Sequence, residues 1–251
     1  MSNIKFFKDI LKYDVKEVGG KGASLGEMFN GGISVPPGFV ITTYAYNKPL
    51  TTRIENEIFN AFEKLKTKKV AVRSSAIAED SKISSWAGQL ESYLNVTREN
   101  LIENIRKCWN SIKSERVLAY AYSKNLSKDQ LTVAVVVQKM VNSQVSGVTF
   151  TANPITNNLS EIMIESGFGL GELVVGGMIT PDNFTVDIKT LKIKSKTIQK
   201  KPSLSDKQIK ELTNLCLEIQ KLFGSPQDIE WAMSKGKFYI LQSRPITTLV
   251  N

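Results

Sequence analysis

The 251-residue sequence contains no histidine. This absence excludes Ser-His-Asp and Cys-His catalysis, histidine zinc sites and a phosphohistidine carrier within the chain. Cysteine is almost as scarce, since Cys108 and Cys216 are the only two and lie far apart in helix-like stretches. So few thiols, so widely spaced, indicate reduced core residues rather than a disulfide.

Long apolar runs are also missing. No segment approaches ~18 uninterrupted apolar residues, and the N-terminal MSNIKFFKDILKYD lacks the apolar core of a signal peptide. We therefore expect neither membrane insertion nor export, and a cytoplasmic location. The net charge of +9 comes mostly from lysines scattered over the expected surface, without the aromatic-basic interleaving of single-strand binders. We expect no nucleic-acid partner.

The chain is long enough for one divided domain or two lobes. We place the boundary near Val96, which gives an N-terminal lobe of residues 1–96 and a C-terminal lobe of residues 97–251. Apolar periodicity predicts helices over residues 52–66 and 99–125, and apolar runs between residues 131 and 168 predict strands of a well-covered sheet. Ser205 and Gln208 predict a capping box for a further helix that ends at Phe223.

A glycine-punctuated segment precedes the first expected helix. Gly19, Gly20, Lys21 and Gly22 come ahead of a helix-like run over residues 23–30. A lysine on a glycine loop at a helix N-terminus has the outline of a phosphate cradle. The segment does not match the G-x-x-x-x-G-K-[ST] pattern of a P-loop, and the alternative is a loop that only turns the chain.

A second polar segment follows a short apolar strand over residues 70–72. Arg73 is expected at the end of this strand, where an arginine can grip phosphate with two hydrogen bonds. The residues expected to expose donors in the loop beyond it are Ser74, Ser75, Ser84, Ser85 and Gly88. Such a loop could close over a polyphosphate, and the alternative is a solvated loop with a surface arginine.

Residues 228–244 read as a β-hairpin, with DIEWAM and KFYILQSR as strands around a Ser-Lys-Gly turn. With a three-residue loop and Gly236 in the left-handed region, one face would carry Asp228, Glu230, Gln242 and Arg244. A two-residue Lys-Gly turn would place Glu230 and Gln242 on opposite faces. Carboxylate and amide oxygens suit Mg²⁺, and arginine suits phosphate. The alternative is an ordinary amphipathic hairpin with one wet face.

Taken in order, these segments resemble the nucleotide-binding domain of the dikinase family, which includes phosphoenolpyruvate synthase (pyruvate, water dikinase), pyruvate phosphate dikinase and rifampin phosphotransferase. The resemblance runs from about Asp14 to Thr247 and rests on VGGKGASLGEM, VPPGFVITTYAY, VAVRSSAIAEDSKISSWAGQLESYLNV, VVVQKMV, SGVTFTANP, ESGFGLGE and DIEWAMSKGKFYILQSRPIT. It implies an ATP-grasp fold of the α+β class, in which two lobes of mixed or antiparallel sheets flanked by helices hold ATP between them.

The resemblance also implies roles for particular residues at the phosphate end. Lys21 and Arg73 would contact the ATP phosphates. Gly88 and Ser92, in the segment AGQLES, would lie over the phosphates as a mobile lid. Serine stands where the family's lid usually has threonine, and it keeps the hydroxyl.

The remaining implied residues surround the adenine and the metal. Glu230 and Gln242 would hold Mg²⁺, while Arg244 would stabilise the transferring phosphate and complete the catalytic set with the lysine and arginine named above. The residues expected around the adenine are Gln138, Met140 and Val141.

In the family, ATP yields AMP, phosphate and a phosphohistidine that later passes its phosphoryl group to pyruvate or another acceptor. This chain has no histidine, so it would perform at most the first half, with a swivelling histidine domain supplied by another chain or a missing segment. A different hypothesis is a non-catalytic adenine-nucleotide-binding sensor or regulatory module. The joint presence of Lys21, Arg73, Glu230, Gln242 and Arg244 favours catalysis, because a mere binder could lose the metal pair.

Overall fold

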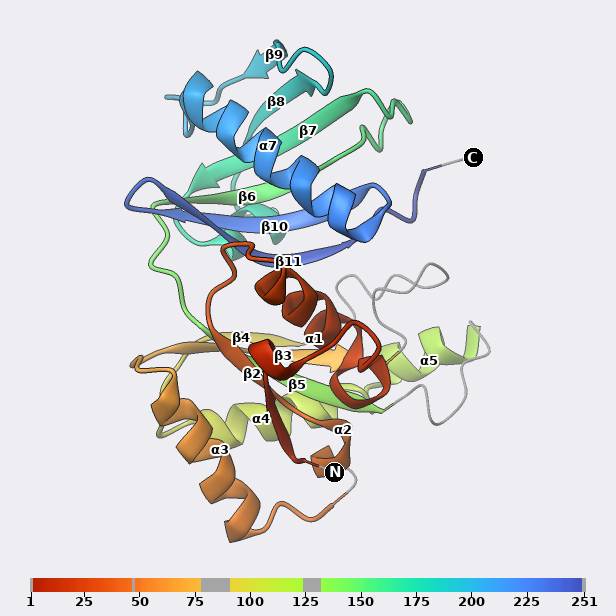
Figure 1. Cartoon of the computed structure of the whole chain (residues 1–251), viewed down its shortest axis with the longest axis vertical. Coiled ribbons are helices and arrows are strands. Elements are labelled where there is room, and N and C mark those ends of the chain that lie inside the picture. The colour runs from red at the N-terminus through yellow and green to blue at the C-terminus, as the bar shows by residue number, and fades with distance from the viewer. Residues whose placement is uncertain (1, 47, 78–90, 124–131, 250–251) are drawn as a thin grey trace. The chain divides into compact units, whose positions relative to one another are not determined.

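The computed structural model describes residues 2–46, 48–77, 91–123 and 132–249, and the chain divides into two compact units (Figure 1). Unit 1 comprises Met1–Asn30 and Pro36–Met140, and unit 2 comprises Gly31–Val35 and Val141–Asn251. The boundary expected near Val96 therefore falls inside unit 1. The reason is that the elements following Val96 complete the first sheet and its helical cover instead of starting a second unit.

Unit 1 is built on a five-stranded antiparallel sheet of order β1-β2-β5-β3-β4. Its strands are β1 (Ile4–Phe6), β2 (Gly38–Ile41), β3 (Val70–Ala76), β4 (Ser92–Val96) and β5 (Val133–Lys139). The apolar run of β5 occupies the centre of the sheet, where residues 133–138 are all buried. A strand covered on both faces needs such continuous apolarity, so this part of the sequence prediction is confirmed.

Helices cover both faces of this sheet. One face packs on α1 (Val15–Asn30), and the other on α3 (Thr52–Lys64) and α4 (Leu101–Ser111) in a single apolar core. The short elements η1 (Phe7–Asp9), α2 (Thr43–Tyr46) and α5 (Glu115–Ser123) complete the unit. Strand alternation divides β5 between the faces: Val133, Val135 and Val137 belong to the core with α3 and α4, so Val136 and Gln138 point toward the α1 face.

The long helix expected over residues 99–125 is wrong as a single element, because α4 ends at Ser111 and α5 begins at Glu115. Ser114 starts the second helix: its hydroxyl accepts the Val117 amide at 3.4 Å, and its carbonyl accepts the Leu118 amide at 3.0 Å. A serine at such a position competes for backbone hydrogen bonds and restarts a helix. Apolar periodicity alone does not report that break.

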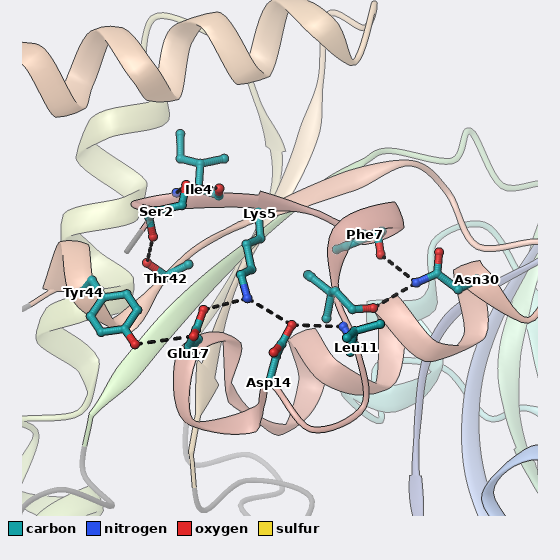
Figure 2. A network of polar contacts seen from close by, with 11 residues as sticks. Ser2, Ile4, Lys5, Phe7, Leu11, Asp14, Glu17, Asn30, Thr42 and Tyr44 are labelled. Carbon is teal, nitrogen blue, oxygen red and sulfur yellow. Dashed lines mark hydrogen bonds and ion pairs between the residues drawn. The ribbon is translucent and has the colours of Figure 1, made fainter.

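A polar network holds the start of α1 against β1 and α2 (Figure 2). The Lys5 ammonium reaches Asp14 at 3.0 Å and Glu17 at 2.7 Å, and the Tyr44 hydroxyl donates to Glu17 at 3.4 Å. Asp14 also accepts the Leu11 amide at 3.0 Å. The network therefore joins three chain segments just before the glycine-rich part of α1.

Unit 2 contains a six-stranded antiparallel sheet of order β11-β10-β6-β7-β8-β9. The strands are β6 (Val145–Phe150), β7 (Glu161–Phe168), β8 (Asp182–Asp187), β9 (Ile193–Thr197), β10 (Gln227–Ser234) and β11 (Lys237–Pro245). The helices are α6 (Gly171–Val175) and α7 (Asp206–Phe223), and α7 runs across one face of the sheet (Figure 1). On that face Trp231 is fully buried and donates to the Thr149 hydroxyl at 3.0 Å.

Several sequence predictions for unit 2 are confirmed. Ser205 and Gln208 form the expected capping box, and Gly224 ends α7 in the left-handed conformation. Cys216 is a buried residue of this helix, and Cys108 is buried in unit 1; neither is in a disulfide. The expected α+β class, with sheets flanked by helices, is present in both units. None of the described helices combines the length and apolarity needed to cross a membrane.

The Asp14 network gives a first prediction. Burial alone would raise the pKa of Asp14, but the Leu11 amide and the Lys5 ammonium together hold it below the ordinary value. A depressed carboxyl pKa stabilises the fold above the unfolded-state pKa, and the contribution is lost as the pH falls through the folded-state pKa. We expect Asp14→Asn to lower the free energy of unfolding by about 1 kcal/mol at pH 7.

Urea unfolding of the variant and the wild type at several pH values would measure this. The difference should shrink as the pH drops below about 4, where the wild-type carboxylate becomes protonated. The exposed Asp9 provides the matched substitution, Asp9→Asn, which should change little. A stability difference for Asp14→Asn that stays constant down to low pH would contradict the assignment.

Candidate functional site

The candidate site in unit 1 begins with Lys21, which is only 5% exposed on α1. Its ammonium donates to the Ser74 carbonyl on β3 at 2.9 Å. The expected loop ahead of a helix at residue 23 is wrong, because α1 already includes residues 20–22 after a kink at Gly19. The lysine therefore projects from the first turn beyond a kink and is held against the sheet.

Gly19 and Ser75 make the closest approach between α1 and β3. Gly19 has φ +71°, and a Cβ built there would lie 2.2 Å from the Ser75 carbonyl oxygen. The Ser75 hydroxyl donates to the Val18 carbonyl at 2.8 Å and accepts the Gly22 amide at 3.1 Å. One hydroxyl thus joins both sides of the kink, and only glycine fits the position between them.

The serines after Arg73 correct a further expectation. Ser74 and Ser75 do not expose donors in a loop: both are fully buried, because β3 continues to Ala76. The Ser74 hydroxyl faces the other helical layer and lies 3.4 Å from the Cys108 carbonyl of α4. Hydrogen bonds to both helical layers explain how two serines are accommodated inside a buried strand.

Arg73, Gln138 and Ser92 lie on the α1 face of the same sheet. Arg73 is opposite Val136 on one side and Ser92 on the other, while Gln138 is opposite Ala71 one step along. Since Val72 and Val137 belong to the opposite core, alternation places these three side chains with Lys21 on one face. Gln138 is 2% exposed, and its amide donates to the Pro36 carbonyl at 3.5 Å.

Fewer contacts are known for the other residues expected around the adenine and in the lid. Met140 follows β5, and its amide donates to the Lys69 carbonyl at 3.2 Å, which extends the ladder with β3. Val141 comes next along the chain and is partly buried. Gly88 lies outside the described residues.

In unit 2 the hairpin of β10 and β11 forms in an unexpected way. Ser234 is opposite Lys237, so the turn has two residues, Lys235 and Gly236, both with positive φ. A regular ladder from that turn would put Gln242 on the face opposite to Glu230. Instead the register shifts between Glu230 and Trp231, and the extra residue in β11 is Leu241.

This β-bulge restores the face that the sequence analysis derived from a three-residue loop. Beyond the shift, Glu230 is opposite Gln242 and Asp228 is opposite Arg244. The three-residue turn on which that prediction depended is wrong. The shared face is nevertheless present, because a bulge shifts the alternation of one strand by one residue. Bulges of this kind re-aim side chains and are frequent next to functional sites.

Arg244 and Asp228 form a partly buried ion pair on this face. The Arg244 guanidinium donates twice to one Asp228 oxygen, from Nε at 2.8 Å and from Nη2 at 2.7 Å. Burial raises the pKa of Asp228, Arg244 opposes the increase, and the Glu230 charge adds to it. The pair therefore holds the guanidinium against the sheet within an excess of negative charge.

The neighbouring pair of opposite residues, Glu230 and Gln242, carries oxygen donors. Gln242 is 5% exposed, and its amide makes no hydrogen bond with a described residue. A buried amide normally finds a partner, so its oxygen is a candidate ligand atom beside the carboxylate of Glu230. Within the part of the chain that the structure covers, no three acidic, cysteine or histidine side chains converge closely enough to hold a metal. Glu230 and Gln242 supply one carboxylate and one amide, so they do not count as a group of that kind.

Two features of the site were missed in the sequence. Ser75 was assigned to a loop, and only its partners on α1 reveal its role. Glu165, on β7, was not singled out at all. It is opposite Val148 on β6, which is in turn opposite Glu230, so both glutamates are on one face. The alternation in EIMIES could have indicated a strand with Glu165 on one side, but not its neighbours.

A family model and several known proteins match nearly the whole chain. The family model described as "Pyruvate phosphate dikinase, AMP/ATP-binding domain" matches residues 15–65, 47–203 and 199–251. A probable phosphoenolpyruvate synthase from Methanocaldococcus jannaschii is 37% identical over 99% of this chain and 27% of its own length. The phosphoenolpyruvate synthase of Pyrococcus furiosus is 36% identical over 98% of this chain and 44% of its own length.

A further relative and one solved structure complete the comparison. The rifampicin phosphotransferase of Bacillus cereus is 35% identical over 97% of this chain and 36% of its own length. Among solved structures, D-alanyl-alanine synthetase A from Vibrio cholerae aligns with a TM-score of 0.48 and 12% identity, over 90% of this chain and 54% of that one. The chain thus spans less than half the length of each of these three sequence relatives.

The contact between Gly19 and Ser75 gives a second prediction. Gly19→Ala adds a left-handed strain of roughly 1–2 kcal/mol and also a clash with the Ser75 carbonyl, so the loss in unfolding free energy should exceed the strain alone. Gly32→Ala is the matched control, since Gly32 has φ +79° and no atom within 4 Å of a built Cβ. Denaturant unfolding of the two variants separates strain from clash, and equal losses would contradict the close approach.

Proposed function

The chain belongs to the pyruvate phosphate dikinase AMP/ATP-binding domain family, and from this premise we propose that it binds Mg-ATP and phosphorylates a histidine outside itself. The observation that carries the proposal is the β10–β11 face. There a bulge brings Glu230, Gln242 and Arg244 to one side of the sheet. An adenine-nucleotide domain without catalysis would not need all three on that face.

In unit 1, the candidate residues for binding phosphate are Lys21 and Arg73. Both are on the α1 face, and Lys21 is held there by the Ser74 carbonyl. We propose that these two cations bind the ATP phosphates, with Ser92 near them opposite Arg73 and Gly88 in the lid. Gln138, Met140 and Val141 line the adenine in the same proposal.

Unit 2 fits a divalent cation. The side-chain amide of the buried residue Gln242, which has no hydrogen-bond partner among the described residues, and the adjacent Glu230 carboxylate offer oxygen donors of the kind that Mg²⁺ takes. We propose that these two residues hold it. When bound, Mg²⁺ neutralises phosphate charge during transfer. Arg244, positioned by Asp228, is aimed to stabilise charge on the phosphoryl group that moves.

The overall half-reaction balances with water as a reactant. ATP, a histidine and water give AMP, phosphate and a phosphohistidine: one P–O bond breaks as the histidine nitrogen attacks, and water breaks the other. The chain's own groups need only bind, orient and neutralise charge, because phosphoryl transfer depends on these more than on covalent help. A chain without histidine is therefore suited to it, provided that a partner carries the acceptor.

The whole reaction, its final acceptor and the partner belong to the same proposal. The phosphoenolpyruvate synthases and the rifampicin phosphotransferase that the chain resembles are longer proteins. We propose that the acceptor histidine is on a separate domain or chain of a phosphoenolpyruvate synthase-like system. A cytoplasmic location, which suits two cysteines outside any disulfide, is part of the proposal.

A third prediction tests the proposed chemistry. The chain would be mixed with Mg-ATP and a separately expressed histidine domain of a phosphoenolpyruvate synthase, and AMP would be followed. Arg244→Ala should lower AMP formation about 100-fold or more, because a pre-positioned cation at the transferring phosphate is removed. Arg98→Ala, which removes an exposed ion pair with Glu63 and a cation–π contact with the Phe59 ring, both in unit 1 rather than in the hairpin, is the matched control and should leave the rate unchanged.

Two outcomes would count against the proposal. If the wild type binds ATP but produces no AMP with a histidine domain that is competent with its own nucleotide domain, the non-catalytic module is favoured. If Arg244→Ala is folded by circular dichroism and keeps its rate, the hairpin is not the catalytic face.

A further inference from the structure

We propose that Glu165 is an outer-sphere ligand of the divalent cation, accepting hydrogen bonds from water molecules on the ion that Glu230 and Gln242 hold. The inference rests on the proposed function and adds a residue from a third strand, β7, to the metal end of the site. Glu165 would then be a positioning residue that acts through metal-bound water.

The register of unit 2 places Glu165 in line with the proposed ligands. From β7 to β11 the directly opposite residues are Glu165, Val148, Glu230 and Gln242. Directly opposite residues in a sheet project to the same face. The row therefore presents two carboxylates and an amide, with only a valine between the carboxylates.

Strand spacing decides which kind of ligand Glu165 can be. Two strand separations put the Cα atoms of Glu165 and Glu230 about 10 Å apart. An ion that the directly opposite Glu230 and Gln242 both hold lies above their two strands, about one and a half strand separations, or roughly 7 Å, from the strand of Glu165, and this offset favours contact through water over direct ligation. Mg²⁺ keeps several of its waters, and a water between the ion and a carboxylate spans the remaining distance.

Among the described residues, no cation or hydrogen-bond donor compensates the charge of Glu165. Its side chain is partly buried, and it makes no hydrogen bond or ion pair with a described residue. Burial raises the pKa of Glu165, and the negative charge of Asp228 raises it further. A carboxylate in such a place is stabilised by an added cation. Gln242 is more than nine-tenths buried, and its side-chain amide has no hydrogen-bond partner in the part of the chain that the structure describes, which independently points to a ligand at the same row.

On one side of the Glu165 row, the segment that contains α6 packs on the sheet at Gly167. Gly167 follows Glu165 on the same face, and a Cβ built there would lie 2.5 Å from Ile179 and 3.0 Å from Val174. The missing side chain lets the segment with α6 pack directly on the sheet, next to the Glu165 row. The segment limits the directions from which bulk water reaches the Glu165 carboxylate.

Glu161 offers a matched control for the test. It is on the same strand and the same face as Glu165, but Lys194 and Asn153 already bind its carboxylate. Glu165→Gln and Glu161→Gln remove the same charge four residues apart on one strand. Mn²⁺ would be titrated into the full chain with and without ATP, and the free ion followed by electron paramagnetic resonance.

We expect Glu165→Gln to weaken Mn²⁺ binding about 10-fold, as loss of an outer-shell partner does, and Glu161→Gln to leave it unchanged. Glu230→Gln should weaken it more, because a direct ligand is lost. If Glu165→Gln matches the wild type while Glu230→Gln weakens binding, the inference on Glu165 is overturned and the proposed function stands. If Glu230→Gln also matches the wild type, the metal site of the proposed function itself is wrong. Equal weakening by Glu165→Gln and Glu161→Gln would show a general charge effect and also overturn the inference.

Discussion

The candidate site of unit 2 depends on one extra residue in a strand. With the two-residue turn at Lys235 and Gly236, an unbroken ladder would direct Gln242 and Arg244 into the core under α7. Leu241 shifts the alternation by one, so both side chains emerge beside Glu230 and Asp228. The core face benefits from the same shift, since Ser243 then bonds to Gln227 at 2.9 Å inside the sheet. One bulge therefore satisfies the core and the candidate site together.

Unit 1 solves a comparable problem with a glycine. Lys21 must be close to β3, yet a regular helix from Val15 would carry side chains into the strand. The kink at Gly19 removes the obstructing side chain, and the Ser75 hydroxyl replaces the helical hydrogen bonds that the kink interrupts. The network around Asp14 fixes the chain just before that kink. In both units, a local departure from regular structure positions residues of the candidate site.

The sequence predicted what depends on neighbours along the chain. The capping box of Ser205 and Gln208 and the apolar strand β5 are local patterns, and both are confirmed. The family assignment also followed from ordered local motifs. By contrast, the roles of Ser74 and Ser75 depend on helices far away in sequence, so polarity alone assigned them wrongly to a loop.

Strand register marks the limit of that reasoning most clearly. The shared face of the hairpin was derived from a turn length that the structure does not have, and a bulge inside an apolar strand produced it instead. Glu165 could not be found for a related reason: its place beside Glu230 depends on the pairing of β6 with β10, two strands that are far apart in sequence. No single-chain pattern records which residue of β6 is opposite Glu230.

Overall charge and local charge lead to different conclusions for this protein. A net charge of +9 suggests affinity for anions anywhere on the surface. On one face of the unit 2 sheet, however, the carboxylates of Asp228, Glu230 and Glu165 lie on the same side as the guanidinium of Arg244, so ionised side chains leave a local excess of negative charge. A bare polyphosphate would be repelled there, while a polyphosphate with its divalent cation would not be. The lysine and arginine of unit 1 suit phosphate oxygens directly, whereas the acidic face of unit 2 suits the metal that accompanies them. In the proposed function, that division would favour Mg-ATP over a bare polyphosphate.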